Sequence, residues 1–205
     1  MSSQAPRRVA GKRQPPIEAV VIGTSAGGLA ALSVLVAGLA ATFRLPLLVV
    51  QHIPSGVPTQ LAEIFRRKTG LHVKEADEKE TVRGGTLYFA APGYHLLVEQ
   101  DASLSLSQDD SVHFSRPSID VLFESAADAW GERVAGILLT GANEDGAARL
   151  EASHRAGGLP ILQRILRESV PVLLIAGTID VLAGVTIEKR VESVLLYPRL
   201  LGLVP

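Results

Sequence analysis

Short apolar runs recur along most of this chain and predict its strands. Continuous runs rich in Val, Ile and Leu are typical of strands buried on both faces of a sheet, and they occupy residues 19–22, 45–50, 134–139 and 159–162. Shorter runs separated by turn residues predict a further strand followed by a hairpin, at residues 86–89, 96–98 and 104–106.

Amphipathic stretches lie between these runs and predict helices. Apolar positions have helical spacing at residues 28–41, 57–70, 119–130 and 145–156, and residues 187–196 predict a closing helix. Ser118 is the expected N-cap of the helix that begins at Ile119. This alternation predicts an α/β fold. We expect a doubly wound, mostly parallel sheet with helices on both faces and a small antiparallel hairpin insertion.

The composition fits one globular domain with a short tail. Hydrophobic residues make up 47% of the 205 residues and charged residues 20%. Residues 1–16 mix basic residues with Ser, Gln and Pro and are predicted to be a disordered tail, so that the domain spans residues 17–205. A formal net charge of -1 gives no reason to expect a nucleic-acid partner.

The residue inventory also limits the chemistry and the compartment. The absence of cysteine excludes disulfides, thiol nucleophiles and cysteine zinc sites and fits a reducing compartment. No secretory signal or bilayer-length apolar run is found, so we expect a cytoplasmic protein without direct membrane insertion. The histidines lack i, i+4 spacing, and we expect no metal and no cofactor.

Three polar residues follow buried runs at or just beyond their carboxyl ends: Ser25, His52 and Asp145. Because ligands bind at the carboxyl ends of strands in doubly wound sheets, we expect these side chains to meet at one edge. Of the five histidines, only His52 has this position. His52 is either a general base or a capped loop histidine. Asp145 is a candidate to orient the imidazole and also a candidate helix N-cap, and one aspartate can fill both roles.

The turn at residues 23–27 matches the G-x-S-x-G pattern of a nucleophile elbow around Ser25. Its glycines permit a sharp strand-to-helix turn, and free backbone N–H groups at Ala26 and Gly27 can stabilise an oxyanion. A nucleotide-binding turn is the competing interpretation. The dinucleotide pattern, however, requires glycine where Ser25 stands, and no P-loop pattern occurs.

Five segments together resemble the catalytic domain of the CheB family of chemotaxis methylesterases. They are VIGTSAGG at residues 21–28, VQHIP at 50–54, APGYHL at 91–96, RPSIDVLF at 116–123, and LLTG at 138–141 with DGA at 145–147. The resemblance implies a Ser25–His52–Asp145 triad that removes methyl esters from glutamate side chains on cytoplasmic receptor helices. It also implies deamidation of receptor glutamines. The family's oxyanion loop corresponds here to Ala142 and Asn143.

The chain departs from the family pattern around its third and fourth long apolar runs. Asn143 and Arg149 stand where the family usually has glycine, Arg164 follows Gln163 in place of aspartate, and Leu173 with Leu174 replace Met-Pro. We also expect no receiver domain, because only about 16 residues precede the first strand. Two alternatives therefore stay open: a weakened or inactive CheB-like binding module, and an esterase with another substrate.

Residues 66–68, Arg-Arg-Lys, are a candidate docking patch for an acidic receptor helix. The alternative is an ordinary solvated face whose last helical turn is basic.

Overall fold

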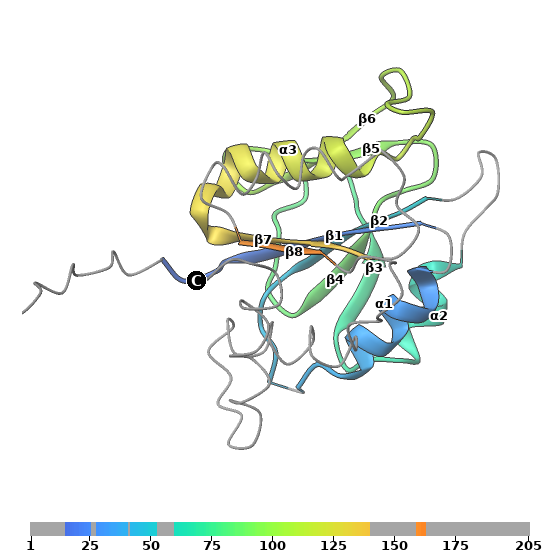
Figure 1. Ribbon diagram of the computed structural model, residues 1–205, viewed down its shortest axis with the longest axis vertical. Helices are drawn as coiled ribbons and strands as arrows, with labels where there is room; N and C mark the ends of the chain where they lie inside the picture. The colour runs from blue at the N-terminus through green and yellow to red at the C-terminus, as the bar shows by residue number, and fades with distance from the viewer. Residues whose placement is uncertain (1–14, 26–27, 41, 53–59, 140–158, 163–205) are drawn as a thin grey trace, which may run out of the picture.

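A six-stranded parallel sheet forms the centre of the protein (Figure 1). The computed structural model describes residues 15–25, 28–40, 42–52, 60–139 and 159–162. The strands are β1 (Ala19–Thr24), β2 (Leu47–Gln51), β3 (His72–Glu75), β4 (Thr86–Phe89), β7 (Val134–Leu138) and β8 (Leu159–Leu162). Their order is β3-β4-β2-β1-β7-β8, and every neighbouring pair is parallel.

Helices cover both faces of this sheet. Helices α1 (Gly28–Ala37) and α2 (Leu61–Arg66) lie on one face, and α3 (Ile119–Trp130) lies on the other. The antiparallel hairpin of β5 (His95–Val98) and β6 (Leu104–Ser107) lies on the side of α3, and the 3-10 turn η1 (Gly131–Arg133) connects α3 to β7. The predicted fold class is confirmed.

Strand β1 explains why the sheet needs cover on both sides. Successive side chains of a strand point to opposite faces. Val20 and Ile22 pack in the core cluster that includes α1 and α2, whereas Ala19 and Val21 pack in the cluster that includes α3, β5 and β6. All six residues of β1 are buried. A continuous apolar run over residues 19–22 is therefore what this central strand requires.

Two helices are shorter than the apolar spacing predicts. Helix α1 ends at Ala37 and not at residue 41, and the Gly38 amide donates to both the Val34 and the Leu35 carbonyls in its last turn. Helix α2 ends at Arg66, four residues before Gly70. The expected helices at 145–156 and 187–196 lie outside the described residues.

The strand order reverses at β1, in the middle of the sheet. Strand β1 lies between β2 and β7, and the chain reaches β2 through α1 on one face and β7 through α3 on the other. In such sheets a ligand crevice forms at the carboxyl ends of the strands beside this point. The residue that leaves this end of β1 is Ser25. Among the described residues, no helix combines the length and apolarity needed to cross a bilayer.

Candidate active site at the strand ends

Ser25 and His52 occupy equivalent positions on neighbouring strands. Thr24 at the end of β1 is paired in register with Gln51 at the end of β2, and Ser25 and His52 come next. The His52 amide donates a hydrogen bond to the Thr24 carbonyl at 2.9 Å. Both residues are half-buried. The predicted nucleophile and base are therefore next to each other at one edge of the sheet.

The turn after Ser25 leads directly into α1. The Gly28 amide donates to the Ser25 carbonyl at 2.9 Å, which closes the turn. Gly28 also packs tightly on the end of β1, because a Cβ at this position would lie 1.5 Å from Thr24 Oγ1 and 2.9 Å from Thr24 Cβ. A side chain at Gly28 would push α1 away from the strand end that carries Ser25. Ala26 and Gly27 lie outside the described residues.

Replacing Gly28 with alanine is expected to lower the free energy of unfolding by about 1–3 kcal/mol, because the methyl group overlaps the wholly buried Thr24 side chain. Urea denaturation measures the change. The matched control is Gly70→Ala, where a Cβ meets no atom within 4 Å and the stability is expected to stay within about 0.5 kcal/mol of wild type. Equal stabilities of the two variants would contradict the packing argument.

Gln51 connects the two candidate catalytic residues. Its side-chain Nε2 donates to the Ser25 carbonyl at 3.2 Å and to the His52 carbonyl at 3.0 Å. The residue is 7% exposed, so these bonds are shielded from water. Gln51 is not among the site residues predicted from the sequence. The available signal was a polar residue at the end of an otherwise apolar strand, directly before His52.

The third strand of the predicted site also ends at this edge. Strand β7 pairs with β1 through Gly23 and Leu138, and the Leu139 amide donates to the Gly23 carbonyl at 2.9 Å. The chain therefore leaves β7 beside the strand end that carries Ser25. Asp145 and the predicted oxyanion residues Ala142 and Asn143 follow, and they lie outside the described residues.

The buried histidine His95 has a structural role. Its Nδ1 accepts a hydrogen bond from the Ser118 amide at 3.1 Å, so in the neutral ring the proton is on Nε2, which lies 3.1 Å from the Asp110 carbonyl. Both ring nitrogens are therefore engaged with the backbone of the segment between β6 and α3. Within the described part of the chain, no group of three or more His, Asp or Glu side chains could hold a metal ion.

The basic patch of residues 66–68 lies at the other end of the sheet. Arg66 Nε donates to the carbonyl of Val73, near the start of β3, and the start of a parallel strand is at the edge opposite Ser25. Arg66 and Arg67 each pair with Glu63 at 3.0 Å. Hydrogen bonds from Arg67 and then Arg66 hold the pKa of the Glu63 carboxyl below its ordinary value. This arrangement fits the ordinary solvated face and is remote from the candidate site.

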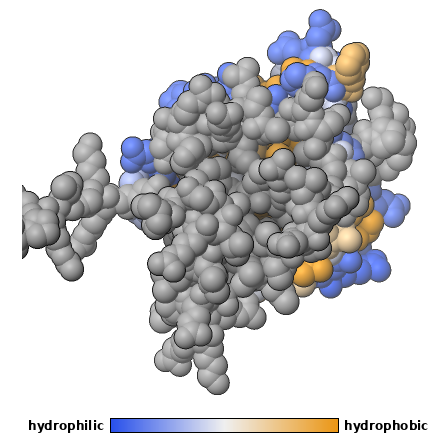
Figure 2. Space-filling view, viewed as in Figure 1, coloured by the Kyte–Doolittle hydropathy of each residue, from blue (hydrophilic) through white to orange (hydrophobic). Residues whose placement is uncertain are grey.

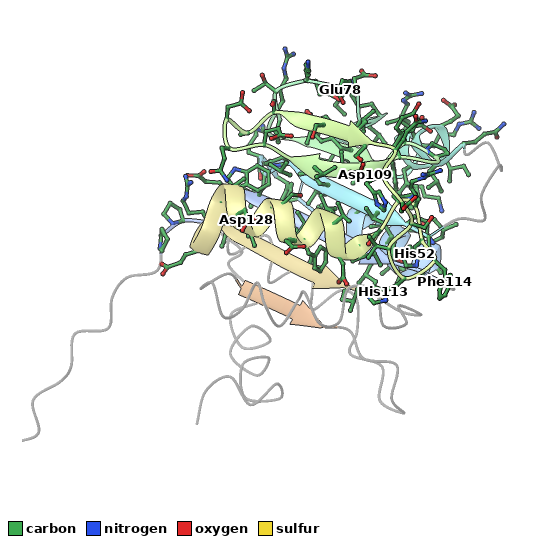
Figure 3. The ribbon with its side chains drawn as sticks, turned by 90° about the horizontal axis from the view of Figure 1, so that it is seen from above. His52, Glu78, Asp109, His113, Phe114 and Asp128 are labelled. Atoms are coloured by element: carbon green, nitrogen blue, oxygen red, sulfur yellow. The ribbon has the colours of Figure 1, made fainter. Side chains whose placement is uncertain are left out.

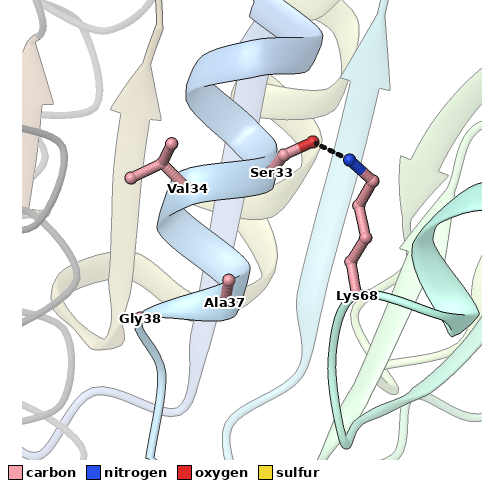
Figure 4. A pocket seen from close by; sticks show the side chains of 5 residues that line it. All are labelled: Ser33, Val34, Ala37, Gly38 and Lys68. Carbon is pink, nitrogen blue, oxygen red and sulfur yellow. Dashed lines mark hydrogen bonds between the residues drawn. The ribbon is translucent and has the colours of Figure 1, made fainter.

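An open hollow of about 500 Å³ lies next to this patch, between the second half of α1 and Lys68, which follows α2 (Figure 4). Lys68 Nζ donates to Ser33 Oγ across it at 3.3 Å. In the face drawn in Figure 2, hydrophobic residues are interspersed with hydrophilic ones at the lower right, where α1 and α2 lie. The hollow adjoins the C-terminal end of α1, which leads away from Ser25 towards β2, so it is not part of the candidate site.

Comparisons with known proteins identify the family of this chain. The family model described as CheB methylesterase matches residues 20–171. A Leptospira interrogans protein is 41% identical over 156 residues, which are 76% of this chain and 81% of that protein. The protein-glutamate methylesterase/protein-glutamine glutaminase of Symbiobacterium thermophilum is 38% identical over 148 residues, which are 72% of this chain and 41% of that longer protein.

The fold has a counterpart among solved structures. The crystal structure of the Thermotoga maritima CheB methylesterase catalytic domain superposes with a TM-score of 0.70 at 26% identity, covering 83% of this chain and 99% of that one. The family model spans most of the chain and includes both Ser25 and His52. The chain belongs to the CheB methylesterase family.

Proposed function

We propose that this chain is a serine esterase that removes methyl esters from glutamate side chains of methyl-accepting chemotaxis receptors. The observation that carries the proposal is the placement of Ser25 and His52 at adjacent strand ends, tied together by Gln51. The relatives named protein-glutamate methylesterase/protein-glutamine glutaminase supply the substrate class. On this proposal the protein acts in the cytoplasm, on the cytoplasmic helices of the receptors, in chemotactic adaptation.

The chemistry proceeds in two steps. Ser25 Oγ attacks the ester carbonyl while His52 accepts its proton, and His52 then returns the proton to the departing methanol. Water, activated by His52, hydrolyses the acyl-enzyme to free glutamate. Asp145 orients and stabilises the imidazolium. Backbone N–H groups of Ala26, Gly27, Ala142 and Asn143 stabilise the oxyanion, and each lost donor would cost about a hundredfold or more in rate.

The same residues support deamidation of receptor glutamines. An amide carbonyl enters the same sequence of steps, with ammonia in place of methanol as the leaving group. The second half of the relatives' name, protein-glutamine glutaminase, favours this additional activity. Both reactions pass through the same acyl-enzyme at Ser25 and give the same glutamate product.

Methanol release from membranes with methyl-labelled receptors tests the proposal. We expect the purified protein to release methanol in a one-to-one ratio with the carboxylates that appear at formerly esterified positions. Mass spectrometry of receptor peptides counts these separately from deamidated glutamines. Membranes without the protein provide the background. Methanol at background level would contradict the proposal and favour the non-catalytic binding module. Hydrolysis of short-chain esters but not of receptors would favour an esterase with another substrate.

A further inference from the structure

The segment between β6 and α3 contains a strained turn with an exposed aromatic ring. Val112 and Ser115 form an antiparallel bridge with two backbone hydrogen bonds, at 3.2 and 2.9 Å. The two residues between them have positive φ, 48° at His113 and 60° at Phe114. Hairpin turns of this kind favour Asn-Gly, because most residues with a Cβ are strained at positive φ.

The Phe114 side chain does not offset this strain by packing. Its relative exposure is 104%, the highest of the large hydrophobic residues that the structure describes. A buried aromatic ring stabilises a fold, whereas a ring in water does not. The strain and the exposure together point to a role for Phe114 outside folding, because strained backbone persists where the surrounding structure enforces it and is often found at ligand contacts.

The surrounding segment is held in place by several polar contacts. His95 binds it at Asp110 and at Ser118, as described above. Arg116 donates to the carbonyls of Gln108 and Asp109 at 2.8 and 3.0 Å. These hydrogen bonds hold the segment that carries Phe114 in one conformation. The segment therefore loses less conformational entropy when Phe114 contacts a partner.

The turn lies at the same end of the sheet as Ser25. His113 Nε2 is 3.4 Å from a carboxylate oxygen of Asp120, which is buried in the first turn of α3. The neighbouring Ile119 packs on β1, since a Cβ at Gly23 would lie 2.3 Å from Ile119 Cγ2. Figure 3 shows His52, His113 and Phe114 together at the end towards which the strand arrows point.

We propose that the turn at residues 112–115 is a substrate-contact element, in which Phe114 packs against the receptor polypeptide while the esterified side chain reaches Ser25. This inference rests on the proposed function and adds a specificity residue to it. A small ester extends less far from the reacting carbonyl than a helix does. Phe114 should therefore contribute more to the recognition of receptors than to that of small esters.

Comparing two substrates tests the inference. The values of kcat/KM are measured for receptor membranes and for the free γ-methyl ester of N-acetylglutamate, with wild type and Phe114→Ala. We expect kcat/KM for receptors to fall about tenfold more than kcat/KM for the small ester, mainly through KM. The matched control is Val34→Ala on α1, an exposed apolar residue remote from the strand ends, for which we expect no change in this ratio.

A second variant separates contact from folding. The substitution Phe114→Gly fits the positive φ of this position and keeps the contact of His113 with Asp120, so its thermal unfolding temperature should be at least that of wild type while the receptor preference is lost. Receptor hydrolysis with an unchanged substrate ratio in both variants would overturn this inference alone. If the wild-type protein hydrolyses the small ester but no receptor, the proposed function fails and the inference fails with it.

Discussion

The Ser25→Ala variant is expected to release methanol from methylated receptors at least about a thousandfold more slowly than the wild-type protein. Alanine has no hydroxyl to form the acyl-enzyme, and the loss of a serine nucleophile removes the whole two-step pathway. What remains is the slower attack of water in a site that still binds the substrate. Methanol release per mole of protein, measured at saturating receptor concentration, gives the ratio of the two kcat values.

Ser33→Ala is the matched control for this experiment. Ser33 lies on α1, the helix that begins at the turn after Ser25, and its Oγ donates to the Leu29 carbonyl at 2.7 Å. Removing this exposed hydroxyl should change the rate less than twofold. A fluorophosphonate probe adds a direct readout, because it should label wild type and Ser33→Ala at Ser25 and leave Ser25→Ala unlabelled. Equal methanol release by Ser25→Ala and wild type would refute the nucleophile assignment.

Helix α3 and strand β1 illustrate what local pattern predicts well. Ile119–Trp130 is helical over the predicted range, and Ser118 caps it by accepting from the Val121 amide at 3.5 Å. The apolar spacing and the capping residue both involve only the helix and the residue before it. The local sequence is therefore enough to predict this helix. The β1 run ends at a glycine-rich turn, and the strand-end rule predicts Ser25 beside His52, which the register of β1 with β2 confirms.

The features that were missed depend on neighbours distant in sequence. The bonds of Gln51 to the Ser25 and His52 carbonyls exist because β1 and β2 are paired in a particular register, which apolar runs do not specify. The His113–Phe114 turn lacks the Asn-Gly signal that predicts such turns, and contacts from Arg116 and His95 hold its segment. Helix α2 likewise ends before Gly70, at Arg66, whose side chain donates to the Val73 carbonyl of β3.

The Gln51→Met variant is expected to lower kcat about ten- to a hundredfold with a smaller change in KM. Methionine has nearly the same length but donates no hydrogen bond, so the Ser25 and His52 carbonyls lose their common donor. A small displacement between nucleophile and base lowers the rate strongly, because proton transfer requires them within hydrogen-bond reach. Gln51 is therefore a positioning residue: it acts through Ser25 and His52 and has no bond to the substrate in the proposed mechanism.

Loss of folded protein must be separated from loss of positioning. Two neutral hydrogen bonds contribute about 1 kcal/mol each, so Gln51→Met should retain its fold at 25 °C, and fluorophosphonate titration counts the sites that remain reactive. The matched control is Gln100→Met, because Gln100 Nε2 also donates to a backbone carbonyl, that of Asp128 at 3.1 Å, on the exposed surface. If kcat per labelled site were the same in Gln51→Met and Gln100→Met, Gln51 would stabilise the fold without aligning the two catalytic residues.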